Sequence, residues 1–401
     1  MTAFDVAVAG GGPSGAWAAF LLAQQGARVV VIDGSHPREK PCGGGVSGRA
    51  LRLVAPAVPA LLRLGVRIQS ATFVDTGSAR RCTVSLGDES HDSGLVVASR
   101  RDMDAHLLAL AREAGAELVT SRVTGLERTS GGYSIRMATG PPLMARAVIG
   151  ADGVTSVVRR RLSVPFRRDQ LSIAAGFFVH GPADTNLVIE FAADPPGYFW
   201  SFPRLDHLAV GVCAQADAGA SSTELKARTA EWLRATGIGS GRRWQPYAWP
   251  IPSLTASDLS TLTVSGDDWC LIGDAAGLVD PITREGIYFA LRSASLAAQA
   301  LGSGSLGRYA SRVRSEIISE LVRAARLKAG FFKPHFTRLV MEAIRESAPI
   351  RRVMADLIAG EQPYDGLAWQ LIRTRELGLA WRLATTTARE RRGVRAGVRK
   401  A

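Results

Sequence analysis

The sequence predicts an α/β chain, α+β overall, in which a Rossmann-type nucleotide-binding domain is interrupted by an antiparallel sheet and followed by helices. Three observations indicate this fold. At the start of the chain an apolar run leads into clustered glycines and a helical repeat. Two later stretches are rich in β-branched and aromatic residues, and each is followed by further strand and helix patterns like those at the start of the chain. Mostly helical periodicity then continues to the end of the chain.

These changes of pattern predict the domain boundaries. The nucleotide-binding domain is expected to be discontinuous, and the inserted antiparallel sheet is expected to bind a substrate. The expected ranges are 1–65, 98–165 and 258–305 for the nucleotide-binding domain, 66–97 and 166–257 for the sheet domain, and 306–401 for a C-terminal helical region with a basic tail.

The N-terminal segment is typical of a strand–helix–strand unit that binds a nucleotide. Gly10 lets the chain turn sharply out of the first strand, Gly12 leaves room for a pyrophosphate, and Gly15 lets the helix pack close to the sheet. Pro13 and Ser14 open the helix, where free N–H groups and the positive end of the dipole favour a phosphate. An ordinary glycine turn is the alternative, and the complete pattern argues against it.

Asp33 ends the second predicted strand, 18 positions after Gly15. A carboxylate at this place accepts hydrogen bonds from ribose hydroxyls and disfavours a 2′-phosphate. The loop is therefore expected to hold FAD or NAD rather than NADP. Gly34 follows directly and is expected to contact the same cofactor.

The chain is strongly basic, with 49 Lys and Arg against 36 Asp and Glu and a formal net charge of +13. Such a surplus favours anionic lipid surfaces, diphosphates or acidic proteins. Specific nucleic-acid binding is not expected, because basic patches with interleaved aromatic residues are not evident. The tail is either a solvated segment or a contact with an anionic membrane. Glu390 is the one acidic residue of this tail. Its basic residues are Arg389, Arg391, Arg392, Arg395, Arg399 and Lys400.

The sequence predicts a cytoplasmic protein, in free solution or peripheral at the inner membrane face through its tail. No apolar run is long enough to cross a bilayer, and the first strand carries Asp5 and leads into glycines. Cys42, Cys82, Cys213 and Cys270 are far apart and have no metal-ligand spacing. No metal site is therefore expected, and all except Cys42 are interpreted as thiols in a reducing compartment.

Three separated stretches resemble the three fingerprints of the FAD-dependent enzymes built like para-hydroxybenzoate hydroxylase. They are the first glycine loop with its acid, the stretch at Asp152 and Gly153, and the stretch at Gly273 and Asp274. The resemblance implies that all three contact FAD. Arg101 opens a predicted helix that resembles the arginine helix of that superfamily, which touches the adenosine side of FAD.

Within that superfamily, further stretches resemble the geranylgeranyl reductase family, over roughly the first three quarters of the chain. They are Pro195-x-x-Tyr198-x-Trp200-x-Phe202-Pro203, Gly273-Asp274-Ala275-Ala276-Gly277 followed by Pro281 and Glu285-Gly286-Ile287, and Lys40-Pro41-Cys42-Gly43. The resemblance implies an FAD-dependent reductase that acts on isoprenoid chains.

The stretch from Asp274 to Ile287 suits a flavin ring. Asp274 can accept hydrogen bonds from ribityl hydroxyls, and the small residues that end at Gly277 leave room for the ring edge. A helix that begins near Gly286 and Ile287 would direct N–H groups to the pyrimidine end of the ring, where reduction places negative charge, an interaction of about 0.3–2 kcal/mol. A turn with an Asp cap is the alternative interpretation.

Cys42 is the candidate catalytic residue. Gly43, Gly44 and Gly45 follow it and let the backbone approach a planar ligand closely. Saturating an isolated alkene needs a hydride on one carbon and a proton on the other, and a thiol beside the flavin is a candidate proton source or gate. The alternative is a small residue that merely fits the loop.

Tyr198, Trp200 and Phe202 alternate along a predicted strand and therefore share one face. By themselves such aromatic residues indicate core. Together with the family resemblance, they are expected to line a long apolar pocket under the flavin. Arg204 comes directly after Pro203 and is expected to provide a cation for the polar head group of the substrate. Arg284 stands where the family often has glycine, and it either binds an anionic head group or narrows the pocket.

The sequence thus predicts an FAD-dependent oxidoreductase that saturates carbon–carbon double bonds of an isoprenoid or prenyl-lipid substrate. NAD(P)H or ferredoxin would supply electrons in a transient encounter, because no second glycine-rich nucleotide loop is apparent. The alternatives are a monooxygenase or halogenase on the same fold, a non-redox flavin-dependent isomerase or cyclase, and a lipid-binding protein. The absence of a Trp-x-Trp-x-Ile-Pro stretch argues against a halogenase.

Overall fold

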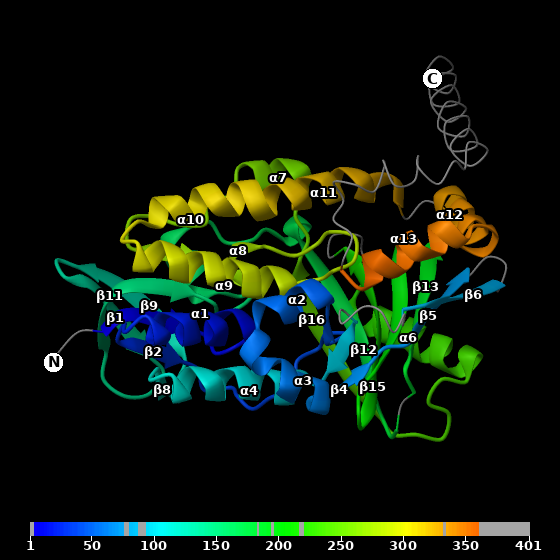
Figure 1. Cartoon of the computed structure of the whole chain (residues 1–401), viewed down its shortest axis with the longest axis horizontal. Helices are drawn as coiled ribbons and strands as arrows, with labels where there is room; N and C mark the ends of the chain where they lie inside the picture. The colour runs from blue at the N-terminus through cyan, green and yellow to red at the C-terminus, as the bar shows by residue number, and fades with distance from the viewer. Residues whose placement is uncertain are drawn as a thin grey trace, which may run out of the picture.

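Two large β-sheets lie end to end along the long axis of the molecule, with helices packed against the first (Figure 1). This computed structural model describes residues 4–75, 80–86, 94–182, 184–193, 196–215, 220–331 and 334–360. Pro195 of the aromatic motif and the basic tail from Arg389 onward lie outside the described residues.

The first sheet is parallel at its centre, as the strand–helix–strand start predicts. Its strands occur in the order β8 (Glu117–Val119), β2 (Val29–Ile32), β1 (Phe4–Ala9), β11 (Leu143–Gly150), β10 (Gly132–Met137) and β9 (Val123–Thr129), with β17 (Trp269–Leu271) beside β11. β1 pairs in parallel with β2 and β11, whereas β10 and β9 add antiparallel strands. β1 is buried from Val6 to Ala9, which is typical of parallel strands covered on both faces.

Helices connect and cover this sheet. α1 (Pro13–Gln24) packs against both α4 (Arg100–Glu113) and α9 (Ile287–Gly302). Beyond α9 run α10 (Leu306–Val313), the π-helical turn η3 (Arg314–Ile318) and α11 (Ser319–Phe331) (Figure 1). The shorter helices are α2 (Gly48–Leu53), η1 (Ala55–Ala57), α3 (Val58–Leu64), α5 (Val157–Leu162), η2 (Arg168–Gln170), α7 (Ala256–Ser260) and α8 (Gly273–Ala276).

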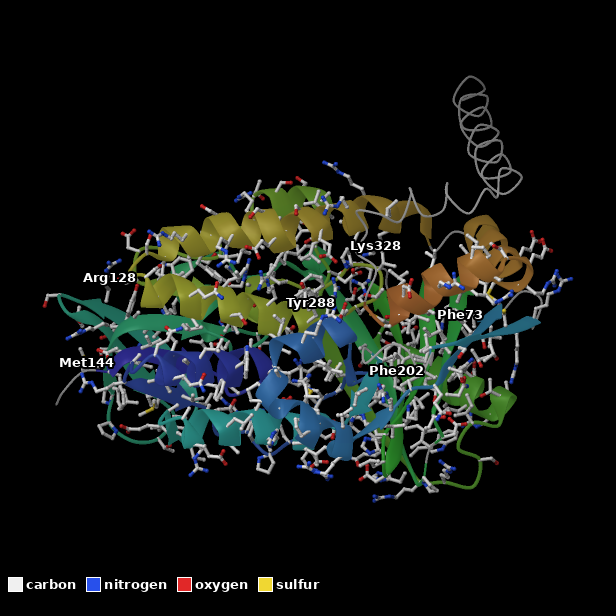
Figure 2. All side chains as sticks on the ribbon, in the orientation of Figure 1. Phe73, Arg128, Met144, Phe202, Tyr288 and Lys328 are labelled. Carbon is white, nitrogen blue, oxygen red and sulfur yellow. The ribbon has the colours of Figure 1, made fainter. Side chains whose placement is uncertain are left out.

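The second sheet is almost entirely antiparallel. Its order is β16 (Trp244–Pro252), β12 (Leu171–His180), β15 (His207–Gln215), β14 (Pro196–Pro203), β13 (Asn186–Ala193), β5 (Ser70–Asp75) and β6 (Arg80–Ser85). Only the β13–β5 pair is parallel among these described strands. Phe73 and Phe202 in this sheet lie far along the long axis from Met144 of the first sheet (Figure 2).

Local signals explain α6 (Ser222–Thr236), which packs on β12 and β15. Ser221 and Glu224 form a capping box, because the Glu224 N–H donates to Ser221 Oγ at 3.2 Å and the Ser221 N–H donates to Glu224 Oε2 at 2.6 Å. Gly237 ends the helix in the left-handed conformation.

Residues 66–97, which were predicted to belong to the sheet domain, contribute strands to two different sheets. β5 and β6 join the second sheet, but β4 (Gly65–Arg67) and β7 (Val96–Ala98) pair with β3 (Gly45–Val46) in a separate small sheet. The C-terminal helices α12 (Pro334–Glu346) and α13 (Ala348–Ile358) pack on β5 and β6 (Figure 1). The mixed α/β fold is confirmed, whereas the domain boundaries stay a prediction.

Candidate active site

A cavity of about 790 Å³ joins the nucleotide loop of the first sheet to one face of the second sheet. Its size is that of cavities that hold cofactors and organic ligands. Most of the residues predicted to form the site line this cavity. They are Gly10, Gly12, Pro13, Ser14, Asp33, Gly34, Cys42, Gly43, Gly44, Asp152, Gly153, Tyr198, Trp200, Phe202, Asp274, Arg284, Gly286 and Ile287.

Three predicted glycines lie just behind the cavity wall. A Cβ atom on Gly15 would lie 1.9 Å from the Gly10 carbonyl oxygen, so Gly15 permits the close contact of helix and turn. Gly273 donates its N–H to Ser293 Oγ at 3.0 Å, and Gly277 ends α8. These residues shape the backbone of the site rather than its surface.

The nucleotide loop leaves its backbone open to the cavity. Gly10 has φ +99°, and a Cβ atom there would lie 2.5 Å from the Ala151 carbonyl oxygen. Gly12 is the N-cap of α1, and a Cβ atom at Gly12 would meet no atom within 4 Å. The start of α1 is therefore accessible to a phosphate group.

Asp33 lies in a polar network beside this loop. Its carboxylate accepts hydrogen bonds from the Gly11 N–H at 2.7 Å and the Ser35 N–H at 2.6 Å. His36 joins Asp33 to Asp104, with ring nitrogens 3.2 and 3.3 Å from the two carboxylates. Although burial acts to raise it, the hydrogen bonds from His36 and Gly11 hold the pKa of Asp33 well below its usual range.

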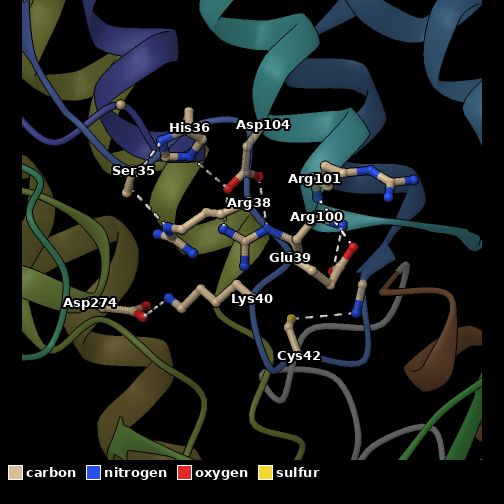
Figure 3. Close-up of polar contacts among 12 residues, drawn as sticks. Ser35, His36, Arg38, Glu39, Lys40, Cys42, Arg100, Arg101, Asp104 and Asp274 are labelled. Carbon is tan, nitrogen blue, oxygen red and sulfur yellow. Dashed lines mark hydrogen bonds and ion pairs between the residues drawn. The ribbon is translucent and has the colours of Figure 1, made fainter. Parts of the chain in front are cut away.

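The arginine of α4 that lines the cavity is Arg100, one position before the predicted Arg101. Arg101 does not line the cavity; its side chain is 49% exposed, pairs with Asp102 and points away from Asp104 (Figure 3). Arg100 lines the cavity instead and is buried. The reason is helical phase, because Arg100, Met103 and Asp104 lie on the buried face of α4, whereas Arg101 does not. That spacing was readable in the sequence.

Asp274 pairs with Lys40, a cavity residue not predicted from the sequence. The Lys40 Nζ atom lies 3.0 Å from Asp274 Oδ2 (Figure 3). Burial acts to raise the pKa of Asp274, but the Lys40 ammonium lowers it below its usual value. A Cβ atom on Gly286, the N-cap of α9, would lie 3.4 Å from Asp274 Oδ1. The carboxylate and the start of α9 therefore face each other, and the prediction of a helix starting near Gly286 is confirmed.

Asp152 lines the cavity and has one unsatisfied carboxylate oxygen. Its Oδ2 accepts a hydrogen bond from the Val157 N–H at 2.6 Å, at the start of α5. Its Oδ1 is buried and has no hydrogen-bond partner within the described part of the chain. Burial raises the pKa of this carboxyl. A ligand with donor groups at this wall would satisfy the orphaned atom, as a dinucleotide cofactor can.

The Cys42 loop crosses from the nucleotide end to the second sheet. Cys42 Sγ accepts a hydrogen bond from the Gly44 N–H at 3.3 Å. A Cβ atom on Gly43 would lie 3.3 Å from the Phe202 ring, so the loop packs directly on the aromatic face. The thiol therefore lies at the boundary between the two ends of the cavity.

Arg204 does not meet the prediction of a head-group contact. It is fully buried and absent from the cavity wall, and it donates to the Cys42 carbonyl oxygen at 2.6 Å from behind the loop. Its guanidinium forms an ion pair with Glu39, which lies 165 positions away in the sequence. No local sequence pattern indicates that pairing.

The second sheet contributes a mainly apolar face to the cavity. Cross-strand neighbours in one row line it, with small residues at the centre, in the order Trp249, Ala174, Cys213, Tyr198 and Phe191. Tyr198 fixes this face to the loop that precedes α9, because its hydroxyl donates to the Thr283 carbonyl oxygen at 2.6 Å. Three apolar residues of the C-terminal region that were not predicted complete the wall, namely Met354, Leu357 and Ile358.

Arg284 lies on the cavity wall in a strained conformation. Its φ of 61° is in the left-handed region, which disfavours residues with a side chain. Its guanidinium donates to Ser253 Oγ at 2.6 Å. The backbone thus holds a cation where glycine would be less strained.

Comparison with known proteins agrees with this geometry. A family model described as an FAD binding domain matches residues 3–308. The chain is 31% identical to a geranylgeranyl diphosphate reductase of Rhodobacter capsulatus, over 83% of this chain and 81% of the relative. The chain belongs to the geranylgeranyl reductase family of FAD-dependent oxidoreductases. As a member of this family it uses FAD, and the orphaned Asp152 oxygen and the open Gly12 backbone fit that cofactor.

Other proteins that are similar to this chain carry different names. A menaquinone reductase of Mycolicibacterium smegmatis is 27% identical over 90% of this chain and 93% of the relative. A geranylgeranyl bacteriochlorophyll reductase-like structure from Thermoplasma acidophilum covers 93% of this chain and 100% of its own, with TM-score 0.75 and 23% identity. The flavin-dependent brominase Bmp2 has TM-score 0.71 and 18% identity and covers 94% of this chain and 99% of its own, which shows a shared fold. Among the described residues no helix combines the length and apolarity that a bilayer crossing requires.

Proposed function

We propose that this chain reduces carbon–carbon double bonds of an isoprenoid or prenyl-lipid substrate, with Cys42 as the proton donor. The observation that carries the proposal is the position of the Cys42 loop. Lys40 of this loop pairs with Asp274 at the FAD end, and Gly43 packs on Phe202 at the apolar end. One loop therefore places a thiol where a cofactor and an apolar chain would meet.

The proposed reaction balances with one hydride and one proton. Reduced FAD, held by the Gly12 loop and Asp274, would supply the hydride for one carbon of the double bond. The Cys42 S–H bond breaks and the proton forms the second new C–H bond, while the π bond is lost. The resulting thiolate is stabilised by the Gly44 N–H and regains a proton from water.

The apolar face of the second sheet is proposed to hold the chain of the substrate, and Arg284 its polar head. Phe191, Ile189 and Ile358 provide an apolar environment with few competing polar groups. The strained backbone at Arg284 supports a functional role, because such strain persists mainly where binding or catalysis uses it. Relatives named as diphosphate reductases support an anionic head.

The remaining assignments are also proposals. NAD(P)H or ferredoxin would reduce the flavin in a transient encounter, and the basic tail would contact an anionic membrane. The first and second sheets, with their flanking segments, would be the FAD-binding and substrate-binding domains.

Product mass tests the reaction. Dithionite-reduced enzyme is incubated with geranylgeranyl diphosphate without oxygen, and the lipid product is analysed by mass spectrometry. A gain of two hydrogens for each reduced bond is expected. An unchanged mass with a rearranged skeleton would indicate an isomerase or cyclase, and a product that appears only with oxygen and contains an added oxygen atom would indicate a monooxygenase.

A further inference from the structure

We propose that Arg204 is a positioning residue that holds the Cys42 loop in its working conformation and thereby couples the second sheet to the thiol. The inference rests on the proposed role of Cys42. Arg204 follows β14 directly, at the turn into β15, and its N–H donates to the His207 carbonyl oxygen at 2.8 Å. The backbone of Arg204 is therefore fixed to the sheet that carries the aromatic face.

The guanidinium of Arg204 contacts three residues, of which Glu39 and Cys42 belong to the Cys42 loop and His207 begins β15. Nη2 donates to the Cys42 carbonyl oxygen at 2.6 Å, and Nη1 donates to Glu39 Oε1 at 2.5 Å. Nη1 also lies 3.0 Å from His207 Nε2. A planar fork with fixed donors suits such a junction, whereas the single ammonium of a lysine does not reach the same partners in the same geometry.

Glu39 extends the junction to the first domain. Its carboxylate accepts from Ser99 Oγ at 2.5 Å and from the Arg100 N–H at 3.1 Å, at the start of α4. The same carboxylate therefore completes the N-terminus of α4 and neutralises Arg204. Removing the arginine charge entirely would leave Glu39 half-buried without its cation.

His207 supports the guanidinium from the other side. A guanidinium has only donors, so His207 Nε2 must accept and Nδ1 must carry the hydrogen that is donated to Asp206 Oδ1 at 2.6 Å. The ring of Phe178 lies 5.5 Å from the Arg204 Cζ atom. All sides of the side chain are thus occupied by protein, and Arg204 has no surface left for a substrate.

The Cys42 loop depends on this support. A Cβ atom on Gly44 would lie 2.3 Å from the Ala98 carbonyl oxygen and 3.2 Å from Arg204 Nη2, so the loop is closely confined between β7 and the guanidinium. Gly44 is also the residue whose N–H contacts the thiol. A shift of the Cys42 carbonyl would therefore move both the sulfur and its hydrogen-bond donor.

A double-mutant cycle tests the inference. Arg204→Lys, Cys42→Ser and the combined variant are purified with FAD, pre-reduced with dithionite, and mixed with geranylgeranyl diphosphate without oxygen. Arg204→Lys should slow flavin re-oxidation by about 10–100-fold, the loss expected from a misplaced group, while FAD content is retained. In the Cys42→Ser background the same change should have little further effect, because it acts through the missing thiol. Additive losses would overturn the inference.

Alkylation of Cys42 gives a readout that does not depend on turnover. The rate of modification by iodoacetamide is followed by peptide mass spectrometry, with Cys82 on β6 as the internal reference. Arg204→Lys should increase the Cys42 rate severalfold relative to Cys82, and Arg128→Lys, at an exposed surface pair, should not. Equal Cys42 rates in wild type and Arg204→Lys would overturn the inference.

A milder variant covers the case in which Arg204→Lys does not fold. Glu39→Gln leaves Arg204 in place and retains an acceptor for Ser99, yet weakens the junction, and it should alter Cys42 alkylation in the same direction. Faster alkylation combined with wild-type re-oxidation in Cys42→Ser would support the positioning role and contradict the proposed proton donation. The two claims can therefore fail separately.

Discussion

Arg100 donates from Nε and Nη2 to the two carboxylate oxygens of Asp104, each at 2.8 Å, and both side chains are buried. Arg100→Gln should therefore destabilise the fold strongly, by about 3–5 kcal/mol, because it leaves the Asp104 charge buried with only His36 as partner. Arg101→Gln is the matched control, and urea unfolding of the two variants measures the difference. Greater loss of stability in Arg101→Gln would contradict the assignment of the inward-facing arginine.

Gly12 gives a direct test of the pyrophosphate position. Its φ of −68° is compatible with any side chain, and a Cβ atom would meet nothing within 4 Å, so a substitution need not disturb the fold. Gly12→Asp should abolish the yellow colour, because a carboxylate would face the phosphates. Gly12→Asn has the same size without the charge and should retain more FAD. Normal flavin absorbance in purified Gly12→Asp would refute the assignment of this loop.

His36 makes stability depend on pH. Burial acts to lower it, but the carboxylates of Asp104 and Asp33 raise the pKa of His36 above its ordinary 6.5. The folded state thus binds the proton more tightly, so the stabilisation is complete below pH 6.5 and is lost as pH rises through the raised folded-state pKa.

His36→Gln should consequently destabilise the protein more at pH 6 than at pH 9, as measured by unfolding in urea at both values. His207 has the opposite sign, because burial and Arg204 lower its pKa, but it is present in both proteins and cancels in the comparison. An equal effect of His36→Gln at both pH values would show that folding does not raise the pKa of His36.

The local parts of this site were predictable and the tertiary parts were not. The glycine loop, Asp33 and the start of α9 depend on residues within one turn or one strand, so their patterns were visible in the sequence. Arg204 depends on a carboxylate 165 positions away, and the apolar wall of Met354 and Ile358 depends on how α13 packs on another sheet. β9 gave no strand signal, because Gly125 interrupts its apolar alternation.

The basic tail is predicted to bind anionic membranes. Removal of residues 389–401 should weaken sedimentation with phosphatidylserine vesicles at low salt, since each basic side chain near such a surface contributes about 1 kcal/mol. Flavin absorbance should remain unchanged. Zwitterionic vesicles serve as the control, and identical binding of the full and shortened chains to anionic vesicles would identify the tail as a solvated segment.

Anaerobic flavin re-oxidation in Cys42→Ser tests the central claim most directly. Wild-type and variant proteins are pre-reduced with dithionite and mixed with geranylgeranyl diphosphate in a stopped-flow instrument, and flavin absorbance is followed. Cys213→Ser is the control, because Cys213 lines the same cavity on the second sheet. Cys42→Ser should retain FAD but re-oxidise about 10²–10⁴-fold more slowly, the loss typical of a missing acid–base group. Re-oxidation of Cys42→Ser at the wild-type rate would contradict proton donation by Cys42.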